Sequence, residues 1–217
     1  LSIFSRMVET APIVERNECY ENEMAGIGCR DQATPTIRFN QCHHNKMAGI
    51  GCREAARPLI LENECRANAL VGIGLQEQAQ AFLQGNKCLD NSLVAIGVTD
   101  GSSATILENE LSRTGGMPPL VAIKDGSQAT LLGNKFAGGG VAALLVQGKA
   151  VVRDNEFTGR SDKQGNAIWI WEGSQALVSA NHFTGYQSAV NAMKSEVTIT
   201  DNRIAQFRGT AIVVRNG

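Results

Sequence analysis

Two tryptophans that stand two residues apart, Trp169 and Trp171, are the side chains of this chain best suited to hold a ligand. They belong to the segment NAIWIWEGS, in which isoleucine and tryptophan alternate with the period of a β-strand. If the isoleucines face the core, both indoles face outward and form an apolar platform on which the apolar face of a sugar ring can stack. The alternative is that the loop containing Pro118 and Pro119, or a partner chain, covers them.

Charged side chains are expected beside this platform. Lys124 is expected in the same outward column as Trp169, and its ammonium group can meet the carboxylate of a uronate. We therefore expect an acidic polysaccharide as the ligand. The candidate ligand-binding residues are Trp169, Trp171, Lys124, Arg160, Asp162, Lys163 and Glu172.

Catalysis on a sugar has its own requirements. General acid–base chemistry needs two carboxylates near the bond that breaks, or a base beside cations. Asp125, Asp162 and Glu172 are the acids that fit this description, because they are close in sequence to Lys124 and Lys163. Their relative placement is open, so no residue is assigned a catalytic role. A polysaccharide lyase, epimerase or hydrolase therefore stays an alternative to a binding module, and whether the chain is an enzyme is left open.

The six cysteines favour buried free thiols, because a free cysteine behaves as a small apolar residue. They fall into two columns of the repeat described below, Cys19, Cys42, Cys65 and Cys88 in one and Cys29 and Cys52 in the other. Later in the chain Leu, Phe, Ile or Val takes the same positions, so these positions require volume rather than sulfur. Disulfides and a metal or catalytic site are the alternatives, and we expect no metal and no cofactor.

His43 and His44 stand beside Cys42 and resemble a metal cluster. Side chains alternate along a strand, so Cys42 is expected to point inward and His43 outward into an exposed polar column. The two residues would then be unable to share a metal. Glu21 is expected one coil away from His44, and this is the one acid–base pair predicted in the early coils.

The elements that position these residues come from a repeat. Asparagine recurs every 23 residues at Asn17, Asn40, Asn63, Asn86 and Asn109, and the series continues at Asn134, Asn155, Asn181 and Asn202. A second series follows five residues behind, at Asn22, Asn45, Asn68 and Asn91. Apolar residues between them alternate with period two and are broken by Asn and Gly, which is typical of short strands and turns. The sequence therefore predicts an all-β fold, a single-stranded right-handed parallel β-helix of about nine coils.

The asparagine columns are expected to lie at turns. Asparagine tolerates the left-handed backbone, and its side-chain amide can bond along a stack of identical turns. Each series is therefore expected to form a ladder of asparagines. An aliphatic residue three positions before each leading asparagine and an apolar residue two positions after it are expected to fill the core.

Two surface features are predicted outside the ladders. The repeat is lengthened at Arg113–Pro119 and Gly159–Asn166, at the same corner of the coil, with Gly138–Gly140 between them. Insertions in solenoids gather on the functional face. Two projecting loops on either side of the short coil with Gly138–Gly140 therefore predict a notch between them. Gly28, Gly51, Gly74 and Gly97 are expected in an outward column without side chains. Such a strip can accept a close ligand or partner; the alternatives are tight turns, or a covering segment.

The coil N-x-C-x-x-N-x-x-x-G-I-G-C resembles the parallel β-helix repeat of the pectate-lyase-like superfamily, roughly from Pro12 to Gly217. It is most similar to the carbohydrate-binding and sugar-hydrolysis type of repeat, which implies a protein that binds or acts on polysaccharides. The motifs of mannuronan epimerases, polygalacturonases and pectate lyases are missing from this sequence. The resemblance therefore implies the fold and carries over no catalytic residue.

Global properties fit one elongated domain over residues 1–217, expected to be part of a longer solenoid. A net charge of −1 without a basic run argues against nucleic acid as a partner, and no apolar stretch is long enough for a membrane span. A protein-interaction or structural solenoid, with end-to-end or face-to-face self-association, stays a third alternative. Localisation is open: extracellular or periplasmic if the parent protein carries a signal, while free thiols also suit the cytoplasm.

Overall fold

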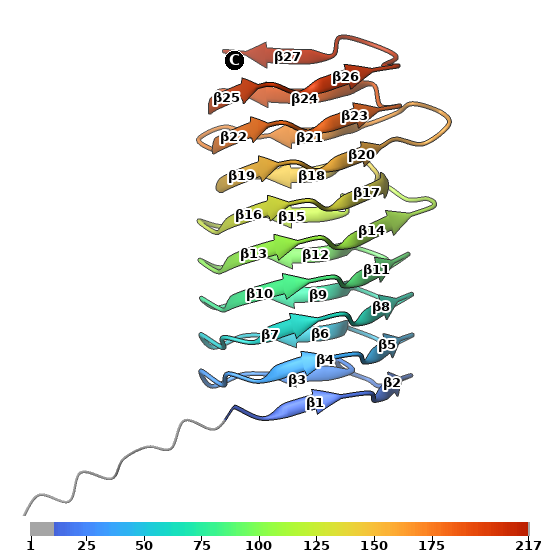
Figure 1. The fold of residues 1–217 in the computed structure, drawn as a ribbon, viewed down its shortest axis with the longest axis vertical. Helices are drawn as coiled ribbons and strands as arrows, with labels where there is room; N and C mark the ends of the chain where they lie inside the picture. The colour runs from blue at the N-terminus through green and yellow to red at the C-terminus, as the bar shows by residue number, and fades with distance from the viewer. Residues whose placement is uncertain (1–10, 217) are drawn as a thin grey trace, which may run out of the picture.

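The computed structural model describes residues 11–216, in which the chain winds nine times around one axis (Figure 1). Each coil contributes one strand to each of three parallel sheets, named A, B and C. Among the described residues there is no helix long and apolar enough to cross a membrane. The predicted all-β, right-handed parallel β-helix of about nine coils is confirmed.

The strands of the three sheets follow one another in strict rotation along the chain. Sheet A contains β1 (Ile13–Glu15), β4 (Thr36–Arg38), β7 (Leu59–Leu61), β10 (Gln80–Gln84), β13 (Ser103–Leu107), β16 (Gln128–Leu132), β19 (Lys149–Arg153), β22 (Gln175–Ser179) and β25 (Glu196–Thr200). Sheet B contains β2 (Glu18–Tyr20), β5 (Gln41–His43), β8 (Glu64–Arg66), β11 (Lys87–Leu89), β14 (Glu110–Arg113), β17 (Lys135–Gly138), β20 (Glu156–Thr158), β23 (His182–Thr184) and β26 (Arg203–Ala205). Sheet C contains β3 (Ile27–Cys29), β6 (Ala48–Cys52), β9 (Val71–Leu75), β12 (Val94–Val98), β15 (Val121–Ile123), β18 (Ala142–Val146), β21 (Asn166–Ile170), β24 (Ser188–Met193) and β27 (Ile212–Arg215).

Equivalent residues of successive coils lie side by side, because the strands pair in parallel and in register. In sheet A, Val14 pairs with Ile37 and Ile37 with Ile60. In sheet B, Cys42 pairs with Cys65. A slip of one residue would turn the buried face of a strand outward, so the apolar columns hold the register.

The core is a set of such columns, and one of them changes its chemistry along the axis. The thiol column of sheet B ends at Cys88, which pairs with Leu111, and Leu111 pairs with Phe136. Phe136, Phe157 and Phe183 then stack face to face, with ring centroids 4.3 and 4.8 Å apart. This confirms that the position needs an apolar side chain, whether a thiol or a ring.

The predicted asparagine ladder is also confirmed. The side-chain amide of Asn63 donates to Asn86 Oδ1 at 3.0 Å and to the Ile37 carbonyl at 2.9 Å, while Asn63 Oδ1 accepts the backbone N–H of Asn40 at 2.9 Å. The same side-chain bond links every leading asparagine from Asn17 to Asn202. Each rung thus ties two coils together inside a turn.

The left-handed residue of this turn is not the asparagine, and that expectation was wrong. Positive φ occurs at the residue before each leading asparagine, at Arg16, Phe39, Glu62, Gly85, Glu108, Gly133, Asp154, Ala180 and Asp201. The preceding residue makes the sharp corner, which leaves the asparagine free to point inward and bond to the next coil. Most of these corner residues carry a Cβ, so the ladder stabilises the strained position.

The second ladder, which starts at Asn22, ends at Asn91. One coil later stands Arg113, whose buried guanidinium donates to the carbonyls of Asn91, Leu93 (2.6 Å) and Pro118 (2.6 Å). Burial lowers the pKa of Arg113 below its ordinary value, and Asp90 opposes that shift. Arg113 therefore closes this ladder and holds the first insertion in place.

The two insertions lie at the corner between sheets B and C, as predicted, and the shorter coil with Gly138–Gly140 lies between them. Val141 donates a backbone hydrogen bond to the Met117 carbonyl at 2.7 Å, and Asn166 donates one to Val141 at 3.0 Å. A Cβ added to Gly140 would overlap the Met117 carbonyl. Gly140 is glycine because the backbone of Met117 in the preceding coil packs against it.

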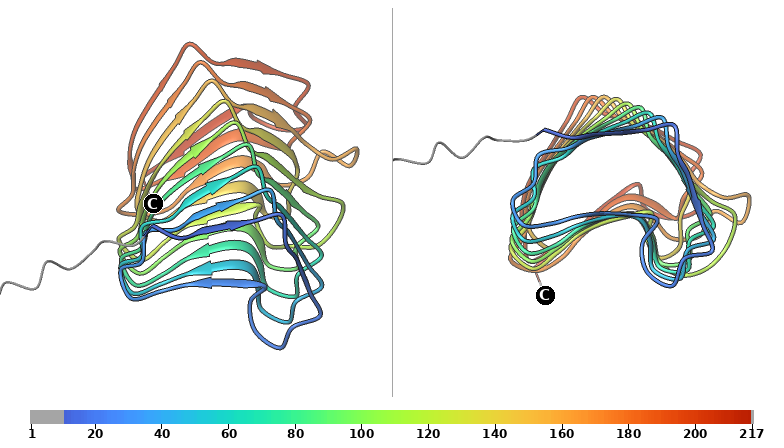
Figure 2. Two further views of the ribbon diagram at one scale, coloured as in Figure 1. Left: turned by 60° about the horizontal axis from the view of Figure 1, so that its bottom comes forward. Right: turned by 90° about the horizontal axis from the view of Figure 1, so that it is seen from below.

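Viewed along the axis, the outline of the coil is indented on the side of sheet C, and the insertions project at the corner between sheets B and C (Figure 2). Sheet A spans the opposite side. The outer faces of sheets A and C therefore offer two separate surfaces for ligands.

Candidate functional site

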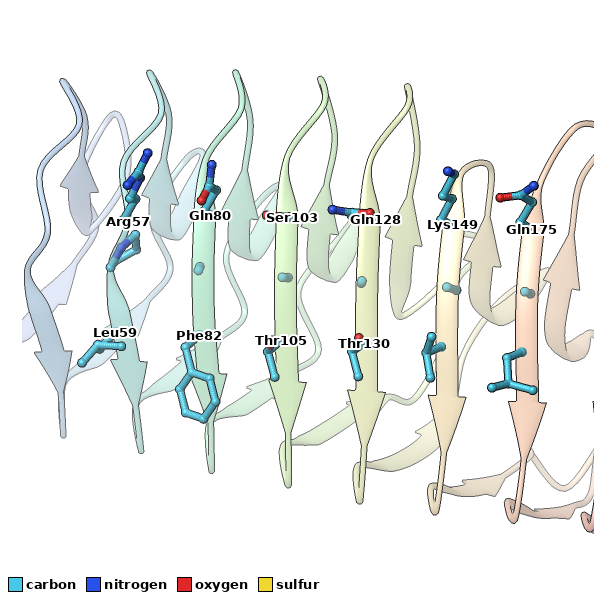
Figure 3. Close-up of a pocket in the computed structure, with 18 of the residues that line it drawn as sticks. Arg57, Leu59, Gln80, Phe82, Ser103, Thr105, Gln128, Thr130, Lys149 and Gln175 are labelled. Carbon is cyan, nitrogen blue, oxygen red and sulfur yellow. The ribbon is translucent and has the colours of Figure 1, made fainter.

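The outer face of sheet A carries a long groove, called groove A, with a volume of about 870 Å³ (Figure 3). Its polar row has one residue per coil: Arg57, Gln80, Ser103, Gln128, Lys149, Gln175 and Glu196. A second row, two residues further along each strand, is Leu59, Phe82, Thr105, Thr130, Val151, Leu177 and Thr198. Both rows point outward because the residues between them alternate into the core.

The floor between the two rows is made by small residues. Alanine occupies it in successive coils, at Ala81, Ala104, Ala129, Ala150 and Ala176. These alanines are buried but keep 5–8% of their surface exposed, unlike the fully buried aliphatic column two residues further along. Because these alanines point into the core, the backbone itself forms the floor, and a ligand can lie on it between the two rows.

The outer face of sheet C carries a narrower groove, called groove C, with a volume of about 500 Å³. Its floor is the predicted glycine column, Gly28, Gly51, Gly74 and Gly97, followed by Ala122. One wall is apolar and includes Met24, Met47, Leu70 and Leu93. The other wall is Arg30, Arg53, Gln76, Thr99 and Lys124.

Trp169 lies in the column of sheet C that contains the glycines, three coils beyond Gly97, and is paired with Leu145 on one side and Asn191 on the other. The rings of Trp169 and Trp171 meet edge to face, with centroids 5.4 Å apart. Trp171 keeps 36% of its surface exposed, so the proline loop does not bury it. The pair forms a partly exposed aromatic patch beyond the end of groove C.

Lys124 does not share the column of Trp169, and that expectation was wrong. Trp169 lies in register with Ala122, through Leu145. Lys124 follows Ile123, which puts it in the column of Trp171, two coils away. At about 4.8 Å per coil the separation along the axis is roughly 10 Å. The misplacement arose in the lengthened coil after Asn109, where counting residues no longer gives the register.

The remaining predicted site residues split between the two ends of β21. Arg160 and Asp162 form an ion pair at 2.9 Å in the insertion before this strand, and Lys163 donates its backbone N–H to the Arg160 carbonyl. Glu172 follows the strand and pairs with Lys194 at 3.7 Å. Five strand residues, roughly 16 Å long at about 3.3 Å each, separate the groups. The seven predicted residues are therefore not gathered into one site.

His43 is buried rather than exposed, which overturns its predicted place in an exposed column. Its Nε2 lies 3.0 Å from Glu18 Oε1, its Nδ1 lies 2.9 Å from Nδ1 of His44, and the Tyr20 ring stacks on it. The acidic partner of His43 is thus Glu18, while Glu21 follows Tyr20 and lies one coil from His44, as predicted. Glu18, His43 and His44 form a hydrogen-bonded chain along which a proton can pass. None of these three residues lines groove A or groove C.

All six cysteines are free, as predicted, and five of them are buried. The pKa of Cys42 is raised by its hydrogen bond with the Cys65 thiol and by burial. The Cys42 thiol therefore stays protonated at neutral pH. The pKa of Cys29, in the other column, is lowered by its hydrogen bond with the Cys52 thiol. No group of three or more metal-ligating side chains occurs in the part of the chain that the structure describes.

Sequence reasoning missed groove A, although its signal was present. The outward position Gln80, Ser103, Gln128, Lys149, Gln175 recurs in consecutive coils and is polar each time. Alternation alone places these residues on the outer face, but it does not show that a second row makes a groove with them.

Comparison with known protein families agrees with this architecture. The chain matches the family model described as right handed beta helix region over residues 9–118 and again over residues 118–217. No curated protein matches the chain. Because the family model covers the nine coils from end to end, the chain belongs to the right-handed β-helix family.

Proposed function

We propose that the protein binds an extended polysaccharide along groove A, parallel to the axis of the β-helix. One observation carries this proposal: the polar row and the second row run without interruption over seven coils. Each coil therefore offers one hydrogen-bonding side chain and one apolar or threonine side chain, in the same arrangement.

A polysaccharide suits this surface because it repeats as the groove does. Each sugar has a rim of hydroxyl groups and an apolar ring face, and successive sugars present them at regular intervals. Amide and hydroxyl side chains such as Gln80, Ser103 and Gln128 can donate to or accept from hydroxyl groups. Phe82, in the second row, offers a ring face for stacking. A rigid scaffold keeps the entropic cost of binding small.

The charges of groove A favour a polysaccharide with some acidic units. Arg57 and Lys149 line the polar row and make no ion pair with a described carboxylate. Each can meet the carboxylate of a uronate. Glu196 and Gln175, which are bonded to each other at 2.9 Å, close the other end of the groove.

Binding is favoured over cleavage because of the carboxylates. Among the described residues that line groove A, Glu196 is the one carboxylate. A glycosidase acts with a pair of carboxylates roughly 5–9.5 Å apart. A lyase or epimerase with an unfamiliar site stays the alternative function, and a test for unsaturated or reducing products from the same oligosaccharides separates it from binding.

The aromatic patch of Trp169 and Trp171 is a second candidate site for the same ligand class. Its support is the partial exposure of Trp171 and the edge-to-face packing that holds both rings. Rigid aromatic rings carry much of the energy of many interfaces. Groove A and the aromatic patch lie on different sheets, so variants distinguish them.

The experiment is calorimetry with oligogalacturonides and with neutral oligoglucans of the same length. Replacing both Phe82 and Gln128 by alanine should weaken binding about tenfold or more, with unchanged thermal unfolding, because both side chains point away from the core. The double replacement of Trp169 and Trp171 by alanine is the matched test of the aromatic patch. If only the tryptophan variant loses binding, groove A is not the site. If no oligosaccharide binds the unaltered protein, the proposed function is wrong.

A further inference from the structure

Groove C is separate from the polysaccharide site proposed for groove A, and its floor is a column of glycines. Each early coil has a Gly-x-Gly pair in sheet C, and the two glycines of a pair have different surroundings. A Cβ on Gly49 would lie 2.7 Å from the Gly72 carbonyl oxygen, and a Cβ on Gly26 would lie 2.9 Å from that of Gly49. The first glycine of each pair is therefore required by packing inside the coil.

The second glycine of the first two pairs has no such reason, whereas a Cβ on Gly74 would lie 3.1 Å from Cγ2 of Val71. A Cβ on Gly28 would meet nothing within 4 Å, and one on Gly51 would touch Ala25 at 3.7 Å, an ordinary contact. Neither residue has positive φ, so the backbone does not require glycine either. Glycine inside a strand costs roughly 0.5–1 kcal/mol relative to alanine. In strands it often marks a place where another molecule approaches the backbone closely.

The groove above this column is amphipathic across its width. Met24, Met47 and Leu93 stand on one side, and two of them are strongly exposed, Met24 at 58% and Leu93 at 45%. Arg30 and Arg53 stand on the other side. Methionine-rich surfaces adapt to the apolar face of a partner.

The positively charged wall of groove C favours a ligand with negative charge. Arg30, Arg53 and Lys124 line the groove, and among its described lining residues there is no carboxylate. None of the three cations forms an ion pair with a described carboxylate. Acidic residues follow at the next corner, at Asp31, Glu54, Glu77, Asp100 and Asp125, outside the groove. The methylene chains of the arginine and lysine side chains can cover the apolar surface of a bound molecule, while their charged groups contact its acidic groups.

The distance between the cationic side chains of groove C favours a peptide over a lipid as its ligand. Arg30 and Arg53 lie at one end of the groove, and Lys124 lies three coils beyond Arg53, roughly 14 Å away at about 4.8 Å per coil. A fatty acid carries its anion at one end of the molecule. A polypeptide can carry acidic groups at both ends, as this wall requires.

The backbone of sheet C distinguishes a helix from an extended segment. The N–H and C=O groups of the floor are already paired between coils, so the floor has no free strand edge. An extended peptide lying along the axis would leave its own backbone groups unpaired. A helix bonds its own backbone and presents only side chains, as in helix-in-groove recognition. Its pitch of about 5.4 Å is close to the coil spacing of about 4.8 Å.

We propose that groove C binds an acidic amphipathic α-helix of a partner protein. The apolar face of the helix lies on the glycine floor against Met24, Met47 and Leu93, and its acidic residues face Arg30, Arg53 and Lys124. The five coils span about 19 Å, which is the length of roughly 13 helical residues.

The test uses fluorescein-labelled helical peptides with leucines at i, i+3, i+4 and i+7 flanked by glutamates, prepared in several registers. Their binding is measured by fluorescence anisotropy, with a matching set in which lysine replaces glutamate. Gly51→Leu fills the groove without touching the core and should weaken binding about tenfold or more. Its matched control is Gly115→Leu, because Gly115 also has open space around it but lies in the first insertion.

Charge is tested separately. Arg53→Glu should weaken binding of the glutamate peptides about tenfold, while Lys135→Glu, on the exposed face of sheet B, should leave it unchanged. Thermal unfolding checks that each variant folds. The proposal is overturned if no peptide of the set binds, if Gly51→Leu has no effect, or if lysine peptides bind equally well. It is also overturned if palmitate displaces the peptides and binds more tightly, or if the unaltered protein dimerises and Gly51→Leu abolishes the dimer.

Discussion

The coils before Asn109 and those after it share one backbone but are filled differently. The first region repeats every 23 residues, has two asparagine ladders, and places thiols in the core and glycines on the outer face of sheet C. The second region has spacings of 25, 21, 26 and 21, keeps one ladder, and packs phenylalanines where the thiols stood.

The difference separates what the fold requires from what it tolerates. The first asparagine ladder passes through both regions unbroken, so a coil of this kind needs it. Core chemistry, coil length and the outer face of sheet C all change at the junction, where Arg113 takes the place of the second ladder. Groove A crosses the junction, while groove C ends just beyond it at Ala122 and Lys124.

The largest expected effect comes from the core column of sheet B. Phe157→Ala should lower the free energy of unfolding by about 3–5 kcal/mol, because the ring is fully buried between Phe136 and Phe183. In the first region, Cys65→Val should change it by less than about 1.5 kcal/mol, because the volume is nearly conserved. Chemical denaturation measures both variants, and equal costs would refute the view that only volume matters there.

The ladder should be equally necessary in both regions. Asn63→Ala and Asn155→Ala each remove the bonds to two coils and leave buried carbonyls without a donor, at about 1–3 kcal/mol for each unpaired group. The two losses in unfolding free energy, from urea titrations, should agree within about 1 kcal/mol. A tolerated replacement in either region would show that the ladder is dispensable there.

The two glycines of a pair in sheet C should respond to replacement by alanine with smaller changes in the free energy of unfolding, and these changes should have opposite signs. Gly49→Ala should cost about 1–3 kcal/mol, because its Cβ would lie 2.7 Å from the Gly72 carbonyl oxygen and 2.9 Å from Cys65 Sγ. Gly51→Ala should stabilise the protein by about 0.5–1 kcal/mol, because its Cβ meets only ordinary contacts. Melting temperatures of the two variants test this. If both variants destabilise, the second glycine is structural and groove C loses its main support.

The last effect is absent at neutral pH, appears only at alkaline pH, and is confined to the region with thiols in its core. The pKa of Cys42 is raised from its ordinary value of 9.0 by the hydrogen bond with Cys65 and by burial. Above pH 9 the unfolded chain releases this proton and the folded chain keeps it, so this thiol alone should lower the unfolding free energy by about 1.4 kcal/mol per pH unit. The pKa values of Cys52 and Cys65 are raised as well, so Cys42→Val should make the decline shallower by the share of one thiol in urea titrations between pH 8 and about pH 10. Rapid labelling of native Cys42 by a thiol reagent would contradict its burial.

Much of the fold could be predicted from the sequence because its determinants are local and repeated. The recurrence of Asn17 at Asn40 and Asn63 predicted the coil, and the alternation around Ile27 and Cys29 predicted the buried face. The glycine column and the free thiols followed from the same register. These inferences succeeded because a parallel β-helix places residues one period apart in direct contact.

What the sequence by itself determined is the coil, its core columns and its ladder, since each of these depends only on position within the repeat. The tertiary structure decided the burial of His43, the column of Lys124, the close packing of the backbone against Gly140, and the two grooves. Each of these depends on how side chains of neighbouring coils pack, or on how loops of unequal length close. Period and alternation contain neither kind of information, because they describe the path of the backbone and not the space between its side chains.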